Sequence, residues 1–262
     1  MKKTVHKRIS DLILPWMLPL LVLIGWQAAA WSGWLSSGIL SSPFDVLRAA
    51  FRLIKTGELF QYIGISSQRA FIGFAIGDSI GLLLGLLTGL FSIAEKLFDT
   101  SVQMLRNIPH LALIPLVIVW FGIEEEAKLF LVALGVLFPV YLNTFHGIRT
   151  VDAKLIEMGR IYGLRGFALF RHIIFPAALP SILVGIRFAL GIMWVTLIVA
   201  ETISANSGIG YMAMNAREFM QIDVVIVSIL LYALLGKLSD SIAKLVEKRF
   251  LQWNPSYRKS RA

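Results

Sequence analysis

Apolar residues in this chain come in long blocks that short polar segments separate. Most blocks run for about 20 residues, the length that an α-helix needs to cross the hydrocarbon core of a bilayer. Backbone groups inside a bilayer must bond within their own segment, so such blocks form helices. The pattern predicts an all-α, polytopic membrane bundle with six spans. We place them at about residues 12–31, 70–91, 108–121, 129–145, 179–200 and 222–238.

The segments at the start and in the middle of the chain refine this picture. The first apolar block is too long for the core of a signal peptide and has no clear cleavage site, so we interpret it as a retained span. Within residues 44–55, apolar side chains repeat at helical spacing and basic side chains lie opposite them. The apolar positions are Phe44, Leu47, Phe51 and Ile54. This pattern predicts an amphipathic helix in the membrane interface or against the bundle. The third span is short and carries Pro109 and Pro115, which is typical of an interrupted helix that faces a cavity.

Glycine occupies every fourth position of the second span. These positions share one face of a helix, and small residues at this spacing let another helix backbone approach closely. In lipid, such packing replaces the hydrophobic force that joins helices in water. We therefore expect a close helix–helix seam at Gly73, Gly77, Gly81, Gly85 and Gly89.

Polar side chains within or next to the apolar spans are candidate functional residues, because they are costly in lipid. Asp78 fits a functional role and an internal polar contact equally well. Arg187 is a functional candidate too, although a long side chain near a helix start can extend to the interface. Asn107 and His110 open the third span, where a plain interfacial position is the simpler interpretation, and Asn143 lies at the end of the fourth.

The net charge of +9 comes from basic residues between the spans and at the chain ends. No basic stripe is interleaved with stacking aromatic residues, so the charge indicates orientation in a membrane and not binding to nucleic acid. The excess of Lys and Arg places both termini, residues 92–107 and residues 147–178 in the cytoplasm. Arg48, Arg52 and Lys55 on the other side are an exception.

The most informative polar segment is residues 157–176, EMGRIYGLRGFALFRHIIFP. A short helix should begin just after Asp152 and run into this segment. Asp152 can cap it, because a carboxylate accepts from the free N–H groups of the first turn. Gly163 can supply the left-handed residue that ends this helix. A second short helix should follow and end at Pro176. Its apolar face consists of Phe167, Phe170 and Ile174.

This segment resembles the cytoplasmic loop of the permease subunits of bacterial ABC importers, whose pattern is E-A-A-x3-G-x9-I-x-L-P. The chain departs from the pattern at Met158, Gly159 and Phe175. The resemblance implies that the segment docks into a groove on a separate ATPase subunit; an ordinary helix–turn–helix loop is the alternative. The expected coupling residues are Glu157, Gly163, Phe167, Phe170, Ile173 and Pro176.

The resemblance extends over roughly residues 60–250. Residues 106–123, RNIPHLALIPLVIVWFGI, and residues 201–219, ETISANSGIGYMAMNAREF, look like the permeases for aliphatic sulfonates. Permeases for taurine, nitrate or thiamine precursors share looser versions and are the alternatives. The resemblance implies a type I importer fold, alternating access and the cytoplasmic membrane of a bacterium. The implied partners are an ABC ATPase dimer, an extracytoplasmic substrate-binding protein and a second permease copy in a homodimer.

Residues 201–221 are polar and contain glycine, so they are expected to form a loop or re-entrant segment on the outer side. Glu201, Asn206 and the turn at residues 207–210 are candidates to receive the binding protein or its released ligand, and a plain connector is the alternative. In the predicted organisation, residues 1–57 precede a permease domain at 58–245, and a basic tail follows at 246–262.

The chain lacks the G-x-x-x-x-G-K-[ST], H-E-x-x-H and G-x-S-x-G motifs, and it contains no cysteine. A phosphate-cradling loop is absent, so we expect ATP hydrolysis to reside on a partner chain. We expect no catalytic residue, no metal and no cofactor. An ATP-independent channel or a membrane enzyme is the alternative from another class.

Overall fold

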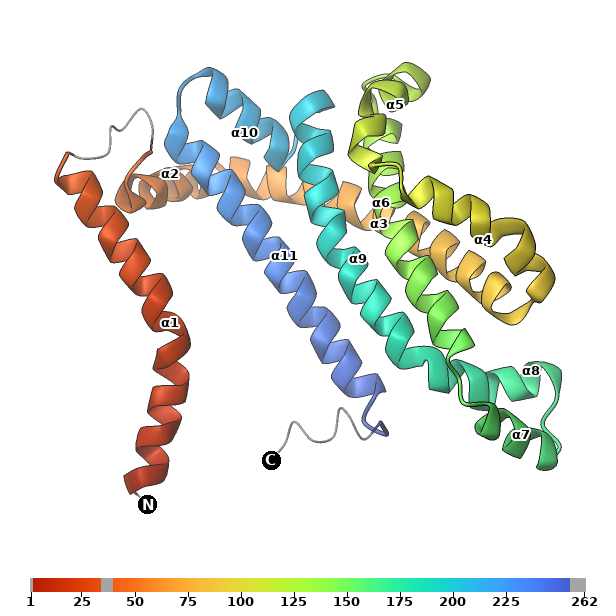
Figure 1. The fold of residues 1–262 in the computed structure, drawn as a ribbon. Coiled ribbons are helices and arrows are strands. Elements are labelled where there is room, and N and C mark those ends of the chain that lie inside the picture. The colour runs from red at the N-terminus through yellow and green to blue at the C-terminus, as the bar shows by residue number, and fades with distance from the viewer. Residues whose placement is uncertain (1, 34–39, 255–262) are drawn as a thin grey trace.

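The computed structural model describes residues 2–33 and 40–254. Every regular element within them is a helix, which confirms the all-α prediction (Figure 1). The α-helices are α1 (Lys2–Trp31), α2 (Pro43–Thr56), α3 (Glu58–Leu90), α4 (Ser92–Arg106), α5 (Ile114–Phe121), α6 (Glu125–Arg149), α7 (Ala153–Ile161), α8 (Gly166–Leu169), α9 (Phe175–Ser204), α10 (Ile209–Glu218) and α11 (Ile222–Phe250). Two short elements of other helical type are η1 (His110–Leu113) and η2 (Phe170–Ile174).

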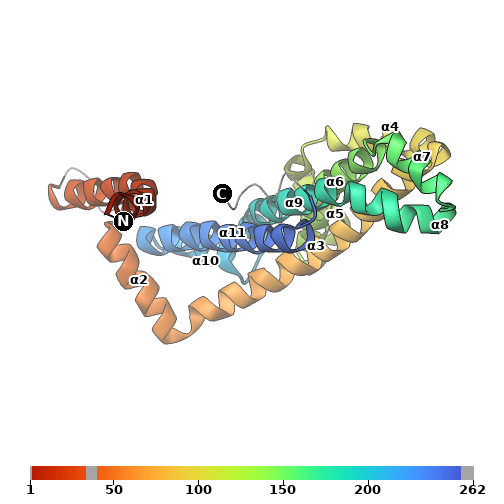
Figure 2. The same cartoon turned by 90° about the horizontal axis from the view of Figure 1, so that it is seen from below.

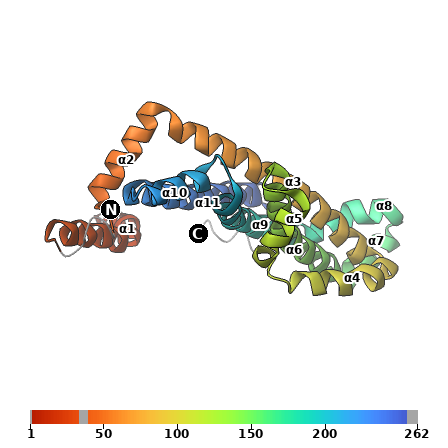
Figure 3. The ribbon, with the colours of Figure 1, turned by 90° about the horizontal axis from the view of Figure 1, so that it is seen from above.

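The long helices run between two ends of the molecule. Helices α5 and α10 lie at one end, which we call the α10 end, and α7 and α8 lie at the other, the α7 end (Figure 1). Seen from below and from above, α3 runs along one side of α9 and α11, while α2 carries α1 away from the bundle (Figures 2 and 3). The start of α1 and the end of α11 both lie toward the α7 end, as expected for an even number of crossings.

Among the described residues, four helices are long and apolar enough to cross a membrane. These are α3, α6, α11 and the continuous helix Gly166–Ile203. Helices α4 and α5 make a fifth crossing only as a pair, because the chain bends by 82° at the break between them. The expected first span lies in α1, whose apolar part within the described residues is the shorter stretch Met17–Trp31.

The third span is short and interrupted, as predicted, but the loop expected before it is a helix. Residues 92–106 form the helix α4, and α5 continues for only 8 residues. The break follows from Pro109, which has no N–H to donate and stands before η1. Pro115 lies in the first turn of α5, where a missing N–H costs nothing.

Helices α3 and α6 pack along the glycine face. At Gly73, Gly77, Gly81, Gly85 and Gly89, an added Cβ atom would come within 3.0 Å of an α6 atom or closer. At Gly81 the neighbour is the Leu137 carbonyl oxygen at 2.7 Å. The two backbones are thus as close as the absence of a side chain permits.

A second glycine seam joins α6 to α9. An added Cβ atom at Gly185 would lie 2.6 Å from Cβ of Asn143, and one at Gly147 would lie 2.8 Å from Cβ of Ser181. The Ser181 hydroxyl donates to the Asn143 carbonyl at 2.8 Å. Helices α3, α6 and α9 therefore form one closely packed unit.

The polar segment at the α7 end folds as expected up to Pro176. The Asp152 carboxylate accepts from the Lys154 N–H at 2.9 Å, and Gly163 ends α7 with φ of 81°. Pro176 does not end the second helix, because α8, η2 and α9 are continuous. A π-turn at η2 directly precedes Pro176.

Helix α2 is amphipathic, as predicted, and the face that packs on the bundle is separate from its stripe of large apolar side chains. Ser42 caps it, and Val46, Ala49 and Leu53 pack against the bundle. The stripe of Phe44, Leu47, Phe51 and Ile54 is exposed. At the other end of the chain, α11 continues to Phe250, so it extends into the first residues of the predicted basic tail.

Candidate functional site

An open groove of about 570 Å³ runs along α9, between the break at η1 and helix α11. Its walls are mainly apolar: Leu111, Val184, Phe188, Ile192 and Val195. Polar groups lie at two places along the groove. Towards the α10 end these are His110 and Thr196, and towards the α7 end they are Arg187 and Asp240.

The first polar pair is a product of the broken span. Nε2 of His110 lies 3.1 Å from the hydroxyl of Thr196, which is fully buried. The 3₁₀ turn of η1 brings the imidazole to α9, and Gly135 on α6 leaves room beside it, with an added Cβ only 2.8 Å from the Thr196 hydroxyl. The predicted residue His110 thus faces the groove, while Asn107 is exposed at the end of α4.

The second polar pair joins α9 to α11. Nε of Arg187 donates to Oδ1 of Asp240 at 2.6 Å, and its Nη1 lies 3.6 Å from Oε2 of Glu247. The other carboxylate oxygen of Asp240 lies 2.7 Å from Nζ of Lys244. Arg187 is therefore held by acidic residues of the neighbouring helix.

A buried polar cluster holds the α10 end together around Glu201. The Glu201 carboxylate, whose side chain is 0% exposed, accepts from the Ser66 hydroxyl, from Nη1 of Arg69 at 2.9 Å and from the Tyr232 hydroxyl at 2.9 Å. It also accepts from the Gly210 N–H at 2.9 Å. One carboxylate thus ties α3, α10 and α11 to the end of α9.

Arg69 extends this cluster to α6 and to the turn before α10. Its guanidinium donates to both oxygens of Glu125, at 2.5 and 2.6 Å, and to the Ser207 carbonyl at 2.6 Å. Gly208 has φ of 102°, and an added Cβ atom there would lie 2.5 Å from Oε1 of Glu201. Arg69 was not predicted as a functional or structural residue, because a basic residue near the start of a span resembles an orientation signal.

Glu201, a candidate to receive the binding protein or its released ligand, is buried among the described residues. Asn206, two residues before the buried Gly208, is exposed at the α10 end. Helix α9 continues through the first residues of the expected loop, and α10 follows it as a short helix that does not span. The accessible part of this segment is therefore smaller than expected.

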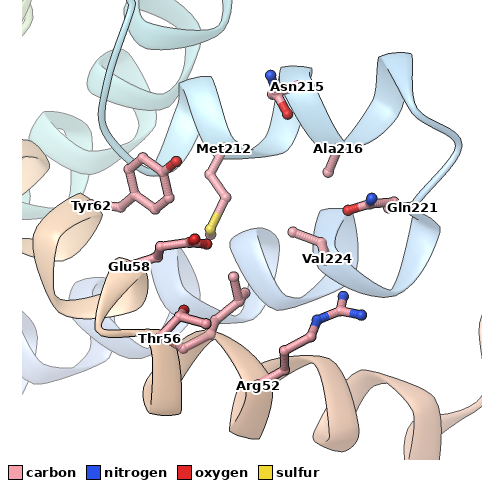
Figure 4. Close-up of a pocket in the computed structure, with 10 residues that line it drawn as sticks. Arg52, Thr56, Glu58, Tyr62, Met212, Asn215, Ala216, Gln221 and Val224 are labelled. Carbon is pink, nitrogen blue, oxygen red and sulfur yellow. The ribbon is translucent and has the colours of Figure 1, made fainter.

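A second cavity of about 250 Å³ lies beside α10. Figure 4 shows Arg52 of α2 and Glu58 of α3 reaching toward it, with Asn215 and Gln221 on the opposite side. Arg52 also lies 3.7 Å from Asp223. This cavity is lined largely by polar side chains.

The segment at the α7 end presents an apolar surface. Phe167 is 73% exposed and Tyr162 80%, and Phe170 is half-buried between Phe167 and Phe175. Glu157 is exposed, and no ion pair joins it to another described residue. The exposed apolar side chains of this surface are Leu155, Met158, Ile161, Tyr162 and Phe167.

Gly159, which departs from the expected loop pattern, sets the packing beneath this surface. An added Cβ there would lie 2.8 Å from Cδ1 of Leu169 and 3.1 Å from Cγ1 of Ile173. Helix α7 thus packs against α8 and η2, and an alanine at Gly159 would require the Leu169 methyl group to shift. Ile173 of η2 and Pro176 of α9 are half-buried.

Asp78 and Asn143 lie apart from both polar pairs of the groove. Asp78 is half-buried on α3, and its Oδ1 has no hydrogen-bond partner among the described groups. The Asn143 amide donates to the Pro139 carbonyl at 2.8 Å, within α6. Asn143 is therefore part of the α6–α9 seam.

A comparison with protein families now decides the class. Residues 80–252, about two thirds of the chain, match the family described as "Binding-protein-dependent transport system inner membrane component". The chain belongs to this permease family. The helices of the groove, the α6–α9 seam and the surface at the α7 end fall within the matched residues. The α3–α6 seam falls within them in part, because Gly73 and Gly77 precede residue 80.

Curated relatives agree with this assignment over nearly the whole chain. The permease is 65% identical over 245 residues to the putative aliphatic sulfonates transport permease protein SsuC of Escherichia coli (strain K12), covering 94% of this chain and 93% of the relative. It is 45% identical to the protein of the same description from Bacillus subtilis (strain 168), covering 92% and 87%.

Solved structures support the fold. The permease aligns with a chain of an amino acid ABC transporter at a TM-score of 0.63 and 18% identity, covering 76% of this chain and 97% of that one. It aligns with a chain of the inward-facing MetNI methionine ABC transporter at a TM-score of 0.56 and 20% identity, covering 69% and 92%. The ABC importer permease fold expected from the sequence is confirmed.

Proposed function

We propose that this permease carries aliphatic sulfonates across the cytoplasmic membrane, as the membrane-spanning subunit of an ABC importer. The observation that carries the proposal is the 65% identity to the sulfonate permease SsuC over 94% of the chain. The taurine permease TauC of Escherichia coli is 34% identical and covers 60% of the chain, so taurine is a weaker candidate.

The groove along α9 suits a substrate of this class. An aliphatic sulfonate has a charged head and an apolar tail. The groove has the ionic groups Arg187 and Asp240 at one place, and apolar walls between them and the His110–Thr196 pair. Phe188 and Val195 on those walls are 62% and 61% exposed in the single chain. A charged groove facing lipid would be costly, so we propose that a second copy covers it in a homodimer.

The surface at the α7 end is the proposed docking site of a separate ATPase subunit. Tyr162 and Phe167 expose large apolar side chains at an end that the charge pattern places in the cytoplasm. Apolar side chains that gather on a surface exposed to water mark a protein contact. ATP binding and hydrolysis on the partner would move the surface at the α7 end. The continuous helix Gly166–Ile203 would transmit this movement to the groove.

The α10 end is the proposed receiving face for an extracytoplasmic binding protein. Asn206 is exposed there, and the polar cavity of Figure 4 lies beside α10. Glu201 stabilises this face from within and does not touch the partner.

Growth on a single sulfur source tests the substrate. A bacterium that lacks its own sulfonate importers should grow on ethanesulfonate when it receives this permease with its partner ATPase and binding protein. Growth on sulfate is the control for viability. If the cells grow on taurine and not on ethanesulfonate, the proposed substrate is wrong.

A further inference from the structure

We infer that the neutral imidazole of His110 holds the sulfonate head group in the groove through its Nδ1–H, and that Thr196 orients the ring for this contact. The inference rests on the proposed function and names the site within it. His110 lies on η1, directly after the break at Pro109, and Thr196 lies on α9. Both residues line the groove.

The buried Thr196 hydroxyl determines which ring nitrogen carries the proton. Its oxygen lies 3.1 Å from Nε2 of His110, and the Thr196 side chain makes no other hydrogen bond to the described residues. A fully buried hydroxyl that donates to nothing is costly, so this O–H donates to Nε2. A ring nitrogen that accepts carries no proton, so the proton of His110 lies on Nδ1. A charged imidazolium would instead leave the Thr196 hydroxyl without an acceptor.

The Nδ1–H of His110 is therefore a donor that the protein leaves available. Nδ1 has no hydrogen-bond partner among the described residues, and it is not enclosed by them. The oxygens of a sulfonate only accept, and a hydrogen bond to an ionised acceptor is stronger than one to a neutral group. A sulfonate head group thus supplies the partner that this donor lacks.

A single neutral donor also suits a solute that must move on. A solute that crosses a membrane has to bind well enough to enter a site and weakly enough to leave it. A full positive charge in a water-poor site attracts an anion much more strongly than a hydrogen-bond donor does. His110 can therefore recognise the anion without trapping it.

Close packing on α6 holds the pair in this arrangement. An added Cβ atom at Gly135 would lie 2.8 Å from the Thr196 hydroxyl and 3.5 Å from Nε2 of His110. A side chain at this position would displace the hydroxyl from the ring. The geometry of the pair thus depends on a third element, which fixes the direction of the Nδ1–H.

The groove beyond the pair fits the other half of the substrate. Ile192 and Phe188 continue the wall along α9, and Leu111 borders it from η1. Thr196 and Arg187 are nine residues apart on one continuous helix, which is about 13 Å along its axis. An octyl chain that starts at His110 would lie along this apolar stretch. Each methylene that it buries adds apolar contact, so longer alkyl chains should bind more tightly.

The simpler alternative is that the His110–Thr196 pair only joins η1 to α9, and two substitutions of His110 separate these roles. A glutamine amide reaches as far as Nε2, so His110→Gln keeps the bond to Thr196 and loses the donor at Nδ1. An asparagine amide reaches only as far as Nδ1, so His110→Asn keeps a donor there and loses the bond to Thr196. His146→Gln, at an exposed position of α6, is the matched control.

The measurement is equilibrium binding of radiolabelled octanesulfonate to the full transporter in nanodiscs, without binding protein, together with uptake in cells. His110→Gln should lose at least about tenfold in affinity, which is the value of one hydrogen bond to a charged group. Its assembly with the ATPase should stay at wild-type level. His110→Asn should lose less affinity than His110→Gln, and His146→Gln should bind like the wild type.

The role of Thr196 has its own test. Thr196→Val keeps the branched shape and removes the hydroxyl, so nothing fixes the proton of His110 on Nδ1. Affinity should fall several-fold, and Thr196→Ser should restore it because serine supplies the hydroxyl again. Equal affinity in Thr196→Val and Thr196→Ser would show that the hydroxyl does not orient the ring.

Two results would overturn the inference while leaving the proposed function intact. The first is a His110→Gln variant that binds and transports octanesulfonate like the wild type. The second is a larger loss of affinity in His110→Asn than in His110→Gln, which is the order that a purely structural link gives. A wild-type complex that assembles and imports no sulfonate overturns the proposed function and this inference together.

Discussion

Glycine determines how closely the central helices of this permease pack. On α3 and α6, most of the contacts are between backbones or between a backbone and the first atoms of a branched side chain, as at Gly85 and Thr144. Lipid supplies no hydrophobic force to join helices, so the close approach itself supplies the attraction. A single methyl group on this face should therefore matter more than a large change on an exposed face.

Gly77→Ala tests this packing, with Gly64→Ala on the same helix as the control. A Cβ atom at Gly77 would overlap the Ala133 carbonyl oxygen, whereas nothing lies within 4 Å of one at Gly64. Overpacking should destabilise the Gly77 variant by about 1–3 kcal/mol. The Gly64 variant should gain about 0.5–1 kcal/mol from helix propensity. Thermal unfolding in detergent measures both, and equal melting temperatures would contradict the seam.

Glu201 is the buried residue with the largest predicted effect. Glu201→Gln leaves Arg69 without its buried anionic partner, and such losses cost about 3–5 kcal/mol. Glu218→Gln, at an exposed position of α10, should be neutral. We expect a low yield of folded Glu201→Gln permease by size-exclusion chromatography. A folded Glu201→Gln variant that only fails to couple to a binding protein would instead favour a surface role for this residue.

At the scale of elements, prolines act differently at two places where the pattern looked alike. Pro109 divides α4 from η1, and that break brings His110 to the groove. Pro176 does not break the helix. The π-turn at η2 precedes it, and the helix continues through α9. Sequence predicts that a proline disturbs a helix, but whether the chain bends depends on the packing of both sides, which local pattern does not contain.

The end of α7 depends on one residue with a left-handed backbone. Gly163 has φ of 81° and open space around it, so a substitution there changes only the backbone strain. Gly163→Val should strain the turn by about 1–2 kcal/mol and reorient the docking surface. Gly163→Asn should be tolerated, since asparagine adopts this conformation more readily. Glu157→Ala should weaken docking through loss of charge alone.

Pull-down of the ATPase subunit with each of these variants measures the effect. The permease should remain in the membrane throughout, and sulfonate uptake should fall in parallel with the ATPase recovered. If Gly163→Val and Glu157→Ala both retain the ATPase and transport normally, the segment at the α7 end is a connector.

For the whole molecule, the sequence predicted the class of fold, the glycine face and the segment at the α7 end. Length and hydropathy suffice for spans such as α6, because a bilayer imposes them locally. The groove could not be predicted, since it needs His110, Arg187 and Asp240 from three separate elements. The Arg69–Glu201 cluster was missed for the same reason, because its members are 132 residues apart in the chain.

The orientation in the membrane is the last prediction, and the absence of cysteine makes it simple to test. The charge pattern places the α7 end in the cytoplasm and the α10 end outside. Single cysteines at the exposed positions Asn206 and Tyr162 report the two ends, and one at the fully buried Ala189 is the control. A membrane-impermeant maleimide should label Asn206→Cys in intact cells and Tyr162→Cys only after permeabilisation. Ala189→Cys should stay unlabelled in both. The reverse pattern would place the apolar surface of Tyr162 and Phe167 outside the cell, out of reach of any cytoplasmic ATPase, and would remove the basis of the proposed coupling.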